Sequence, residues 1–514
     1  MPSYPHDLPP CPPPTESYLP SFWLSEPSHL ENERSTAALP DTSDIVIVGS
    51  GITGSLLAYQ LLQGDPGLKI TMLEAREVCS GATARNGGQC KTDPYIVYRA
   101  HKALYGPELA NELIKFETSH LDRFAALLAK DPIECSFHVT TAFDVCMNAA
   151  MAEKAKASYD ARKTDWPEDM KKYRELDDSE ELERLSGVKG GLWGCMYRVG
   201  SIWPYKLATG LLKRCFEIAT DRAKGGWFNL QTRTPASTIT YSADIGKWTI
   251  ETSRGNIVAP RVVVATNGYT SHLIPDMSNK VVPIRGTASS LHVPKAQAAG
   301  TPSNKIFRPL FTSYALKFGS GMGDYMISRQ EGGKEVVLGG AKQGYIKDPK
   351  NWYGKVDDSE YLPGAVDYFT EYMPKHFVNW PDPTSNIDKV WTGILGYSSD
   401  LLPYVGQHPS QPPGLYVIAG FHGHGMSRIF GSTTALAALM LETASLTASP
   451  ELQTNILLSA GLPKPYVFTK KRMESKENII LESMGHTSQP KQADPEEPLV
   501  DKIGEGMTKI VVAS

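Results

Sequence analysis

The stretch that most constrains this chain is residues 44–54, DIVIVGSGITG. Residues 44–48 are predicted to form a strand, because their continuous, β-branched apolar run is typical of a strand buried on both faces of a parallel sheet. Three glycines follow at the spacing G-x-G-x-x-G. Residues 55–63 then favour a helix, since they contain neither glycine nor proline. The pattern predicts a strand, a tight turn and a helix in succession.

Each part of this pattern has a role in binding a dinucleotide. Gly49 permits the tight turn, Gly51 lets the backbone approach a pyrophosphate, and Gly54 lets the helix pack close to the strand. The helix N-terminus offers free N–H groups to the phosphates. Glu74 ends a second apolar stretch and is placed to accept hydrogen bonds from a ribose 2′-hydroxyl, which disfavours NADP. We predict a dinucleotide site for FAD or NAD. The alternative, a glycine-rich turn in an ordinary α/β unit, leaves Glu74 without a role.

Bulk properties exclude several classes of protein. The length of 514 residues predicts two domains. A formal net charge of −4 gives no reason to expect nucleic-acid binding. The absence of an apolar run of 18 residues predicts no membrane span, and the N-terminus lacks an apolar signal core. Seven scattered cysteines without a C-x-x-C pair predict a reducing compartment and no metal site. We expect a cytoplasmic protein of undetermined oligomeric state.

Both ends of the chain extend beyond the patterned region. Residues 1–40 contain ten prolines, which predicts an extended arm that packs through Phe22, Trp23 and Leu24. Residues 446–514 form a C-terminal extension that turns charged and polar beyond about residue 465. The sequence assigns no function to either end.

Three further segments are predicted to lie in the same domain as the first strand. Residues 80–89, SGATARNGGQ, follow the Glu74 strand and supply backbone donors at the same crevice. Residues 259–269 form another apolar strand that ends in a small-residue turn. Residues 414–420 form a third strand, which leads through the turn FHGHGM into an alanine-rich helix. A glycine turn at a helix start favours negative charge.

The fold class is therefore predicted to be α/β, with a Rossmann-like FAD-binding or NAD-binding domain and an interleaved α+β antiparallel-sheet substrate domain. Residues 286–375 alternate strand and turn patterns, as expected for the second domain. The predicted ranges are 41–100, 190–285 and 386–445 for the dinucleotide-binding domain, and 101–189 and 286–385 for the substrate domain.

Five motifs, in this order, resemble the D-amino-acid-oxidase-like superfamily of FAD-dependent oxidoreductases, which includes glycine oxidase, sarcosine oxidase and γ-glutamylputrescine oxidoreductase. They are the opening fingerprint, GATARNGGQ, VVVATNGY, residues 391–400 and GFHGHGM. The A-R-N-G-G-Q run most resembles the γ-glutamylputrescine oxidoreductase group. The resemblance spans residues 42–445 and implies FAD.

The resemblance also implies which residues contact FAD. The diphosphate contacts would be Gly49, Ser50, Gly51, Ile52, Thr53 and Gly54. The adenosine contacts would be Glu74 with Ala75 and Arg76 beside it, and Ala236, Thr266, Asn267 and Gly268. The residues that follow the diphosphate to the isoalloxazine would be Ser80, Gly81, Thr83, Arg85, Asn86, Gly87, Gly88 and Gln89. The flavin pyrimidine would lie over Gly423, His424, Gly425 and Met426.

The sequence departs from the family at three positions. Gly393 stands where some sarcosine oxidases have the cysteine that attaches FAD, and Arg85 stands where dimethylglycine-type enzymes attach it through histidine. We therefore predict noncovalent FAD. Val337 stands where sarcosine oxidases place an oxygen-activating lysine, although Lys342 is near in sequence. This leaves open whether the chain is an oxidase or a dehydrogenase.

The resemblance implies oxidation of a small amine or amino acid by hydride transfer to flavin, hydrolysis of the imine, and O2 as electron acceptor. Such chemistry needs a neutral amine, hence an apolar or cation-lined pocket. The candidate catalytic residues are His424, Arg285, His422 and Tyr397. Two alternatives remain: a flavoenzyme of secondary metabolism that oxidises a bulkier amine or alcohol, and a flavin-binding protein without catalysis.

Overall fold

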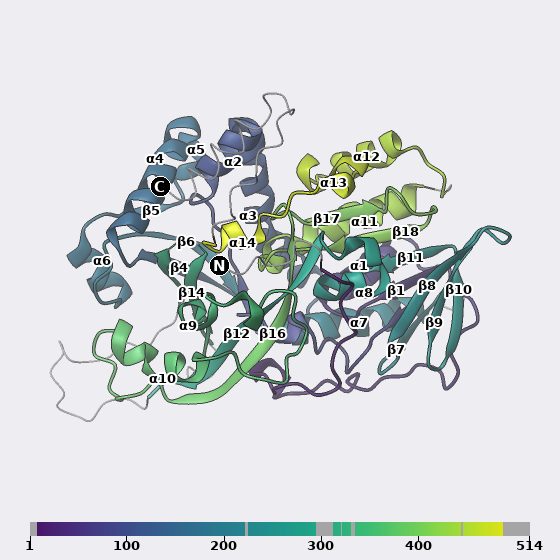
Figure 1. Ribbon diagram of the computed structural model, residues 1–514, viewed down its shortest axis with the longest axis horizontal. Coiled ribbons are helices and arrows are strands. Elements are labelled where there is room, and N and C mark those ends of the chain that lie inside the picture. Colours follow the sequence, from purple (N-terminus) through teal and green to yellow (C-terminus); the bar gives the residue numbers. More distant parts are fainter. Residues whose placement is uncertain are drawn as a thin grey trace.

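The computed structural model describes residues 8–220, 225–294, 312–319, 321–329, 335–443 and 446–486. The extreme ends of the predicted arm and of the C-terminal extension lie outside this part of the chain. Two large sheets organise the molecule, one in each half of Figure 1.

The first sheet contains the predicted Rossmann-like unit. Its six strands lie in the order β17-β18-β11-β1-β2-β7. Strand β1 (Ile45–Val48) lies between β2 (Lys69–Leu73) and β11 (Arg261–Val264), and pairs with both in parallel. Strands β7 (Trp227–Gln231) and β18 (Leu415–Ala419) continue the parallel sheet, and β17 (Tyr404–Gln407) closes one edge antiparallel. The predicted return of residues 259–269 and 414–420 to this sheet is confirmed.

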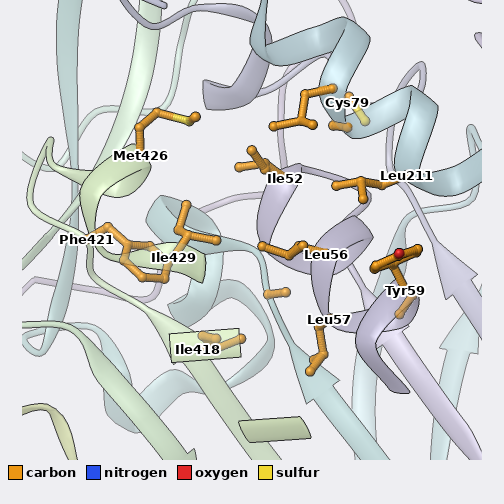
Figure 2. Close-up of a cluster of buried hydrophobic side chains, with 14 of the residues drawn as sticks. Ile52, Leu56, Leu57, Tyr59, Cys79, Leu211, Ile418, Phe421, Met426 and Ile429 are labelled. Atoms are coloured by element: carbon orange, nitrogen blue, oxygen red, sulfur yellow. The ribbon is translucent and has the colours of Figure 1, made fainter. Parts of the chain in front are cut away.

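Three helices cover the sheet: α1 (Ile52–Gly64), α7 (Pro204–Ala219) and α11 (Ile429–Glu442). Helix α1 is buried almost throughout, which explains its weak amphipathic pattern. Figure 2 shows Ile52 and Leu56 of α1 between Leu211 of α7 and Ile429 of α11. The packing fixes the start of α1 against the glycine turn.

The second sheet has nine strands, in the order β16-β12-β15-β14-β13-β4-β6-β3, with β5 paired to β6. All its pairs are antiparallel except β4 with β13. The bounds are Gln89–Cys90 (β3), His138–Cys146 (β4), Arg174–Leu176 (β5), Trp193–Ser201 (β6), Val281–His292 (β12), Ser313–Gly319 (β13), Met322–Ser328 (β14), Glu335–Gly340 (β15) and Ile387–Ser398 (β16). The predicted second sheet is confirmed, and it is antiparallel except for this one pair.

Four segments differ from the predicted domain ranges. Residues 89–90, 193–201, 281–285 and 387–398 fall in the ranges predicted for the dinucleotide-binding domain, but they belong to β3, β6, β12 and β16 of the nine-stranded sheet. The strands β6 and β16 are buried on both faces along most of their length. Their apolar pattern therefore fits either sheet, and only the pairing partner distinguishes the two.

Helices cover the outer face of this second half. Residues 98–130 form two helices, α2 (Tyr98–Tyr105) and α3 (Pro107–Lys130), because Gly106 adopts φ 82° and proline follows it. Residues 149–186 contain α4 (Ala149–Asp165), α5 (Pro167–Met170) and α6 (Ser179–Ser186). Helix α10 (Ala365–His376) lies between β15 and β16 in the chain.

The remaining elements are small. Strands β8 (Ala236–Ser242), β9 (Lys247–Thr252) and β10 (Gly255–Ala259) form a separate antiparallel sheet. Short helices α8 (Thr270–Leu273) and α9 (Lys342–Tyr345) follow β11 and β15. The C-terminal extension carries α12 (Pro450–Ser459), α13 (Lys470–Glu474) and α14 (Ile480–Ser483).

The described part of the N-terminal arm packs on the body as predicted. Phe22 and Trp23 are buried, and Leu24 packs against the same core. None of the helices in the described ranges has the length and hydropathy needed to cross a membrane.

Candidate cofactor and substrate site

A large cavity lies where the two sheets meet. Its volume is about 730 Å³, which is within the usual range for small-molecule and cofactor sites. Its wall includes Val48, Leu73 and Ala265, at the carboxyl ends of β1, β2 and β11, where open α/β sheets bind ligands. The nine-stranded sheet contributes residues of β12, β13, β14 and β16. The site therefore combines the edge of the first sheet with the face of the second.

Most residues predicted to bind the cofactor line this cavity. They are Gly49, Gly51, Ile52, Thr53, Glu74, Ala75, Arg76, Gly81, Thr83, Arg85, Asn86, Gly87, Gln89, Ala236, Thr266, Asn267, Gly268, Gly423, Gly425 and Met426. Four of the predicted residues do not line the cavity: Ser50, Gly54, Ser80 and Gly88. Three of the four candidate catalytic residues, Tyr397, His422 and His424, also line the cavity.

The glycine turn is shaped by close backbone contacts. Gly49 adopts φ 108°, and a Cβ on Gly54 would lie 2.0 Å from the carbonyl oxygen of Gly49. Only glycine fits at these two positions without displacing the helix. The hydroxyl of Thr83 accepts the N–H of Ile52 at 2.9 Å, which ties the loop of residues 80–89 to the start of α1.

Glu74 is held by the turn that it faces. Its Oε2 accepts hydrogen bonds from the backbone N–H of Ser50 at 3.1 Å and from the Ser50 hydroxyl at 2.6 Å. Its Oε1 accepts the N–H of Arg76 at 3.1 Å. These hydrogen bonds from Ser50 and Arg76 fix the Glu74 carboxylate at the cavity wall.

Arg85 lines the cavity, but most of its hydrogen bonds are to other parts of the protein. Its guanidinium is buried and donates to the carbonyl oxygens of Ser80 at 3.0 Å, Leu19 at 2.9 Å and Thr392 at 2.8 Å. Its Nε lies 3.3 Å from Asp358 Oδ2. Burial lowers the pKa of Arg85 below its ordinary value, although Asp358 opposes this shift. The guanidinium therefore connects four segments of the protein, and one edge of it faces the cavity.

The turn after β18 places two histidines at the cavity wall. His422 has φ 52°, and its ring contacts that of Tyr397 with the centroids 4.0 Å apart and the planes tilted by 42°. Burial, with the charges of His424 and Arg428, holds the pKa of His422 well below its ordinary value, so this imidazole is neutral. His424 Nδ1 lies 2.8 Å from the carbonyl oxygen of His422.

His424 also belongs to a charged cluster that sequence reasoning missed. Its Nε2 lies 3.2 Å from Asp93 Oδ2, and Asp93 Oδ1 lies 2.9 Å from Lys317 Nζ. Lys91 pairs with Asp144 at 2.8 Å, and Asp144 is 3.7 Å from Lys317. Burial raises the pKa of Asp93, but the charge of Lys317 and the His424 hydrogen bond outweigh it, so the pKa lies well below its ordinary value.

The far wall carries two more ionisable groups. Burial raises the pKa of Asp324 to about 6, although Oδ2 accepts from Tyr368 at 2.5 Å and Oδ1 accepts the N–H of Ala341 at 2.9 Å. Lys342 lines the cavity and donates to the carbonyl oxygen of Gly321 at 3.0 Å. Val337 is fully buried outside the wall.

A weak signal for part of this cluster exists in the sequence. Lys317 and Asp324 are charged residues inside otherwise apolar strands, a pattern that marks a buried and paired charge. The sequence does not reveal their partners, because Asp93 lies 224 residues before Lys317 and Tyr368 lies 44 residues after Asp324.

Arg285 lies outside the cavity wall. Its Nη2 donates to the carbonyl oxygen of Glu360 at 2.9 Å, and Nη1 lies 3.5 Å from that of Asn351. Strand β12 is buried on both faces, so no apolar-polar alternation in the sequence indicates the direction of this side chain. We do not include Arg285 in the site.

The residues present fit FAD. Three buried polar atoms of the wall have no hydrogen-bond partner within the described part of the chain: Arg85 Nη2, Thr266 Oγ1 and His422 Nδ1. Buried polar atoms are normally satisfied, so these atoms suit the polar groups of a ligand. A Cβ on Gly51 would lie 3.0 Å from Thr83 Oγ1, so glycine leaves this backbone open to a diphosphate. The described residues contain no cluster of His, Cys, Asp and Glu arranged to hold a metal ion.

Comparison with known proteins agrees with this geometry. The family model "DAO: FAD dependent oxidoreductase" matches residues 44–439. Gamma-glutamylputrescine oxidoreductase of Escherichia coli is 25% identical over 394 residues, which cover 75% of this chain and 80% of that protein. The probable oxidoreductase OrdL of Rhizobium meliloti is 24% identical over 403 residues, covering 75% and 79%.

Solved structures share the fold. Glycine oxidase from Geobacillus kaustophilus superposes with a TM-score of 0.58 at 19% identity, covering 80% of this chain and 100% of that one. L-amino acid deaminase from Proteus vulgaris superposes with a TM-score of 0.59 at 17% identity, covering 82% and 98%. The match of the family model to well over half of the chain decides the assignment: the protein belongs to the DAO family of FAD-dependent oxidoreductases.

Proposed function

We propose that this protein oxidises the C–N bond of a small amine or amino acid. The carbon next to nitrogen gives up a hydride and the nitrogen loses a proton, so that an imine forms. Water then adds to the imine, and the C–N bond breaks to release a carbonyl compound together with ammonia from a primary amine or an amine from a secondary one. FAD supplies the two-electron acceptor, and O2 takes two electrons and two protons to become H2O2.

The observation that carries this proposal is the polar wall beside the turn of residues 421–426. A neutral imidazole, His422, packs against the Tyr397 ring and presents an Nδ1 without a hydrogen-bond partner among the described residues. Lys91 and Lys317 line the same cavity, and each is paired with an aspartate. Burial away from water lowers the pKa of a bound amine and so favours its neutral form, which is the form that donates hydride. We assign His422 and Tyr397 to the substrate side, and we propose that the Asp93 carboxylate orients His424.

We propose that FAD is held without a covalent bond. Gly393 has no side chain, and a Cβ there would lie 3.1 Å from Cβ of Arg85. The two positions where relatives attach the flavin are therefore neighbours in this fold, and neither offers a nucleophile. After acid precipitation the yellow colour should stay in the supernatant. A yellow pellet would contradict the noncovalent site.

Peroxide release against a panel of primary, secondary and amino-acid amines tests the reaction. We expect H2O2 with at least one of these amines, and anaerobic bleaching of the bound flavin by the same compound. Bleaching without peroxide identifies a dehydrogenase and removes O2 from the proposal. A flavin that no amine bleaches rules out amine oxidation.

We also propose a cytoplasmic location. The seven cysteines are buried and none of them is in a disulfide, as expected in a reducing compartment. Fractionation of the source cells, with the protein detected by antibody, tests this location; recovery in a secreted or organellar fraction contradicts it.

A further inference from the structure

The N-terminal arm contributes directly to the candidate FAD cavity. Pro13 and Pro14 line it, together with Glu74, Ala75 and Tyr269. These three body residues lie at the end of the cavity that the family resemblance assigns to adenosine. The family model begins only at residue 44, so the arm lies outside the shared fold.

The arm is fixed at its start by a body segment that also lines the cavity. The N–H of Cys11 donates to Ser271 Oγ at 3.0 Å, and the Cys11 thiol lies 3.7 Å from the carbonyl oxygen of Gly268. Gly268 is one of the predicted adenosine contacts and lines the cavity. Pro13 and Pro14 therefore lie over the cavity from an anchored position.

Tyr18 then covers two arginines of the cavity wall. The guanidinium carbons of Arg76 and Arg85 lie 4.7 Å and 4.6 Å from the centre of its ring. The Tyr18 hydroxyl donates to Glu77 Oε2 at 3.1 Å. Asp358 pairs with both arginines, at 3.0 Å and 3.3 Å. The Tyr18 ring therefore holds the arm against both guanidinium groups by cation–π contact.

Further along, the arm holds the loop of residues 80–89. Ser21 Oγ donates to the carbonyl oxygen of Ala84 at 2.6 Å, and Trp23 Nε1 donates to that of Asn86 at 2.6 Å. A Cβ on Gly88 would lie 2.4 Å from the Trp23 ring. The conformation of this loop therefore depends on the arm, and the loop supplies Thr83, Asn86 and Gln89 to the cavity.

We propose that residues 8–24 are part of the FAD site and retain the cofactor. The arm covers the adenosine end through Pro13 and Pro14, and it positions the loop of residues 80–89 through Tyr18, Ser21 and Trp23. FAD leaves only after the arm detaches. The inference rests on the proposed noncovalent binding of FAD in this cavity.

Hydrogen exchange of the full-length protein, with and without FAD, tests this directly. We expect the amides of residues 8–24 to exchange more slowly when FAD is bound, together with those of residues 49–54. Protection of residues 49–54 without any change over residues 8–24 would overturn the inference.

The release rate of FAD gives a second, independent test. Tyr18→Ala removes both ring contacts and should increase the rate of FAD release about tenfold or more. The rate is measured from the recovery of free flavin fluorescence. Tyr18→Phe keeps the ring and should stay close to the native rate. Tyr361→Ala is a control at an exposed tyrosine and should release FAD at the native rate.

The outcomes separate this inference from the proposed function. A native chain that binds no FAD overturns both. A chain that binds FAD and releases it at one rate from all three variants overturns the role of the arm alone. If Tyr18→Ala does not fold, as judged by circular dichroism, Pro14→Gly replaces it in the same release assay. Its control is Pro381→Gly, at an exposed proline outside the arm, which should release FAD at the native rate.

Discussion

Asp324 is a buried carboxyl group whose environment favours its protonated form. Burial raises its pKa to about 6, whereas an aspartate in an unfolded chain titrates near 3.8. The folded state therefore holds a proton that the unfolded state releases. The contribution of Asp324 to the free energy of unfolding is fully present below a pH of about 4 and is lost as the pH rises through about 6.

Asp324→Asn should remove this pH dependence. Asparagine keeps an acceptor for the N–H of Ala341 and a polar group near the Tyr368 hydroxyl. We expect the loss of unfolding free energy between pH 4 and pH 6 to be about 3 kcal/mol smaller in the variant. Urea unfolding across this pH range measures the difference. Parallel profiles for the two proteins would show that Asp324 is ionised throughout.

Gly54 is required by a single backbone contact. A Cβ at this position would lie 2.0 Å from the carbonyl oxygen of Gly49, so Gly54→Ala pushes α1 away from β1. We expect a loss of about 1–3 kcal/mol of stability or more, and a marked loss of FAD affinity. Gly323→Ala is the matched control, because the nearest atom to its Cβ would be 3.7 Å away. Equal stability and FAD affinity in the two variants would contradict the close approach of helix and strand.

The roles of three residues of the cofactor site could be predicted from the sequence. Gly49, Gly54 and Glu74 follow local backbone and hydrogen-bonding rules that act within about 30 residues. The orientation of Arg285 and the pairing of Asp93 with Lys317 were not readable. They depend on strand pairing between residues far apart along the chain.

At the scale of elements, the C-terminal segment closes the second half of the cavity. Ser483 and Met484 line the cavity, and Met484 Sδ lies 3.7 Å from Lys342 Nζ. Ile480 of α14 is fully buried, and the backbone N–H of Ile479 donates to the carbonyl oxygen of Ser399 at 2.9 Å. In Figure 1, α14 lies in the middle of the molecule, between the two halves. The polar tail seen in the sequence thus contains a buried anchor.

Ile480→Ala should detach this segment while the rest of the fold persists. The lost burial weakens the local anchoring by about 2–5 kcal/mol. Limited proteolysis should then cut between residues 464 and 486 faster than in the native protein. Leu452→Ala, at a half-exposed position of α12, should leave the cutting rate unchanged. An Ile480→Ala protein as resistant as the native one would mean that α14 does not hold the segment.

At the scale of the whole molecule, the cavity couples the two sheets. Its wall takes residues from β1, β2 and β11 on one side and from β12, β13, β14 and β16 on the other. A ligand that fills it contacts both halves of the molecule. Ligand binding therefore stabilises the complete fold rather than one domain.

FAD should raise the melting temperature of the cofactor-free protein. At a free concentration one hundred times Kd, binding adds about 2.7 kcal/mol to the free energy of unfolding. FMN lacks adenosine and cannot reach Glu74 while it occupies the flavin end, so its effect at the same concentration should be smaller. Differential scanning calorimetry compares the two. Equal shifts for FMN and FAD would contradict an adenosine subsite at Glu74.

The Rossmann-like unit, its glycine turn, Glu74 and the family follow from the sequence alone, because they depend on short backbone motifs with a fixed spacing along the chain. Strand pairing was needed to show which charged side chains of β13, β14 and the segment after β3 meet at the cavity, and that Arg285 turns away from it. The tertiary structure also decided that residues 8–24 and 476–486 close the site. Strands buried on both faces show no alternation that marks a side, and contacts between distant segments are fixed only when the sheets pair.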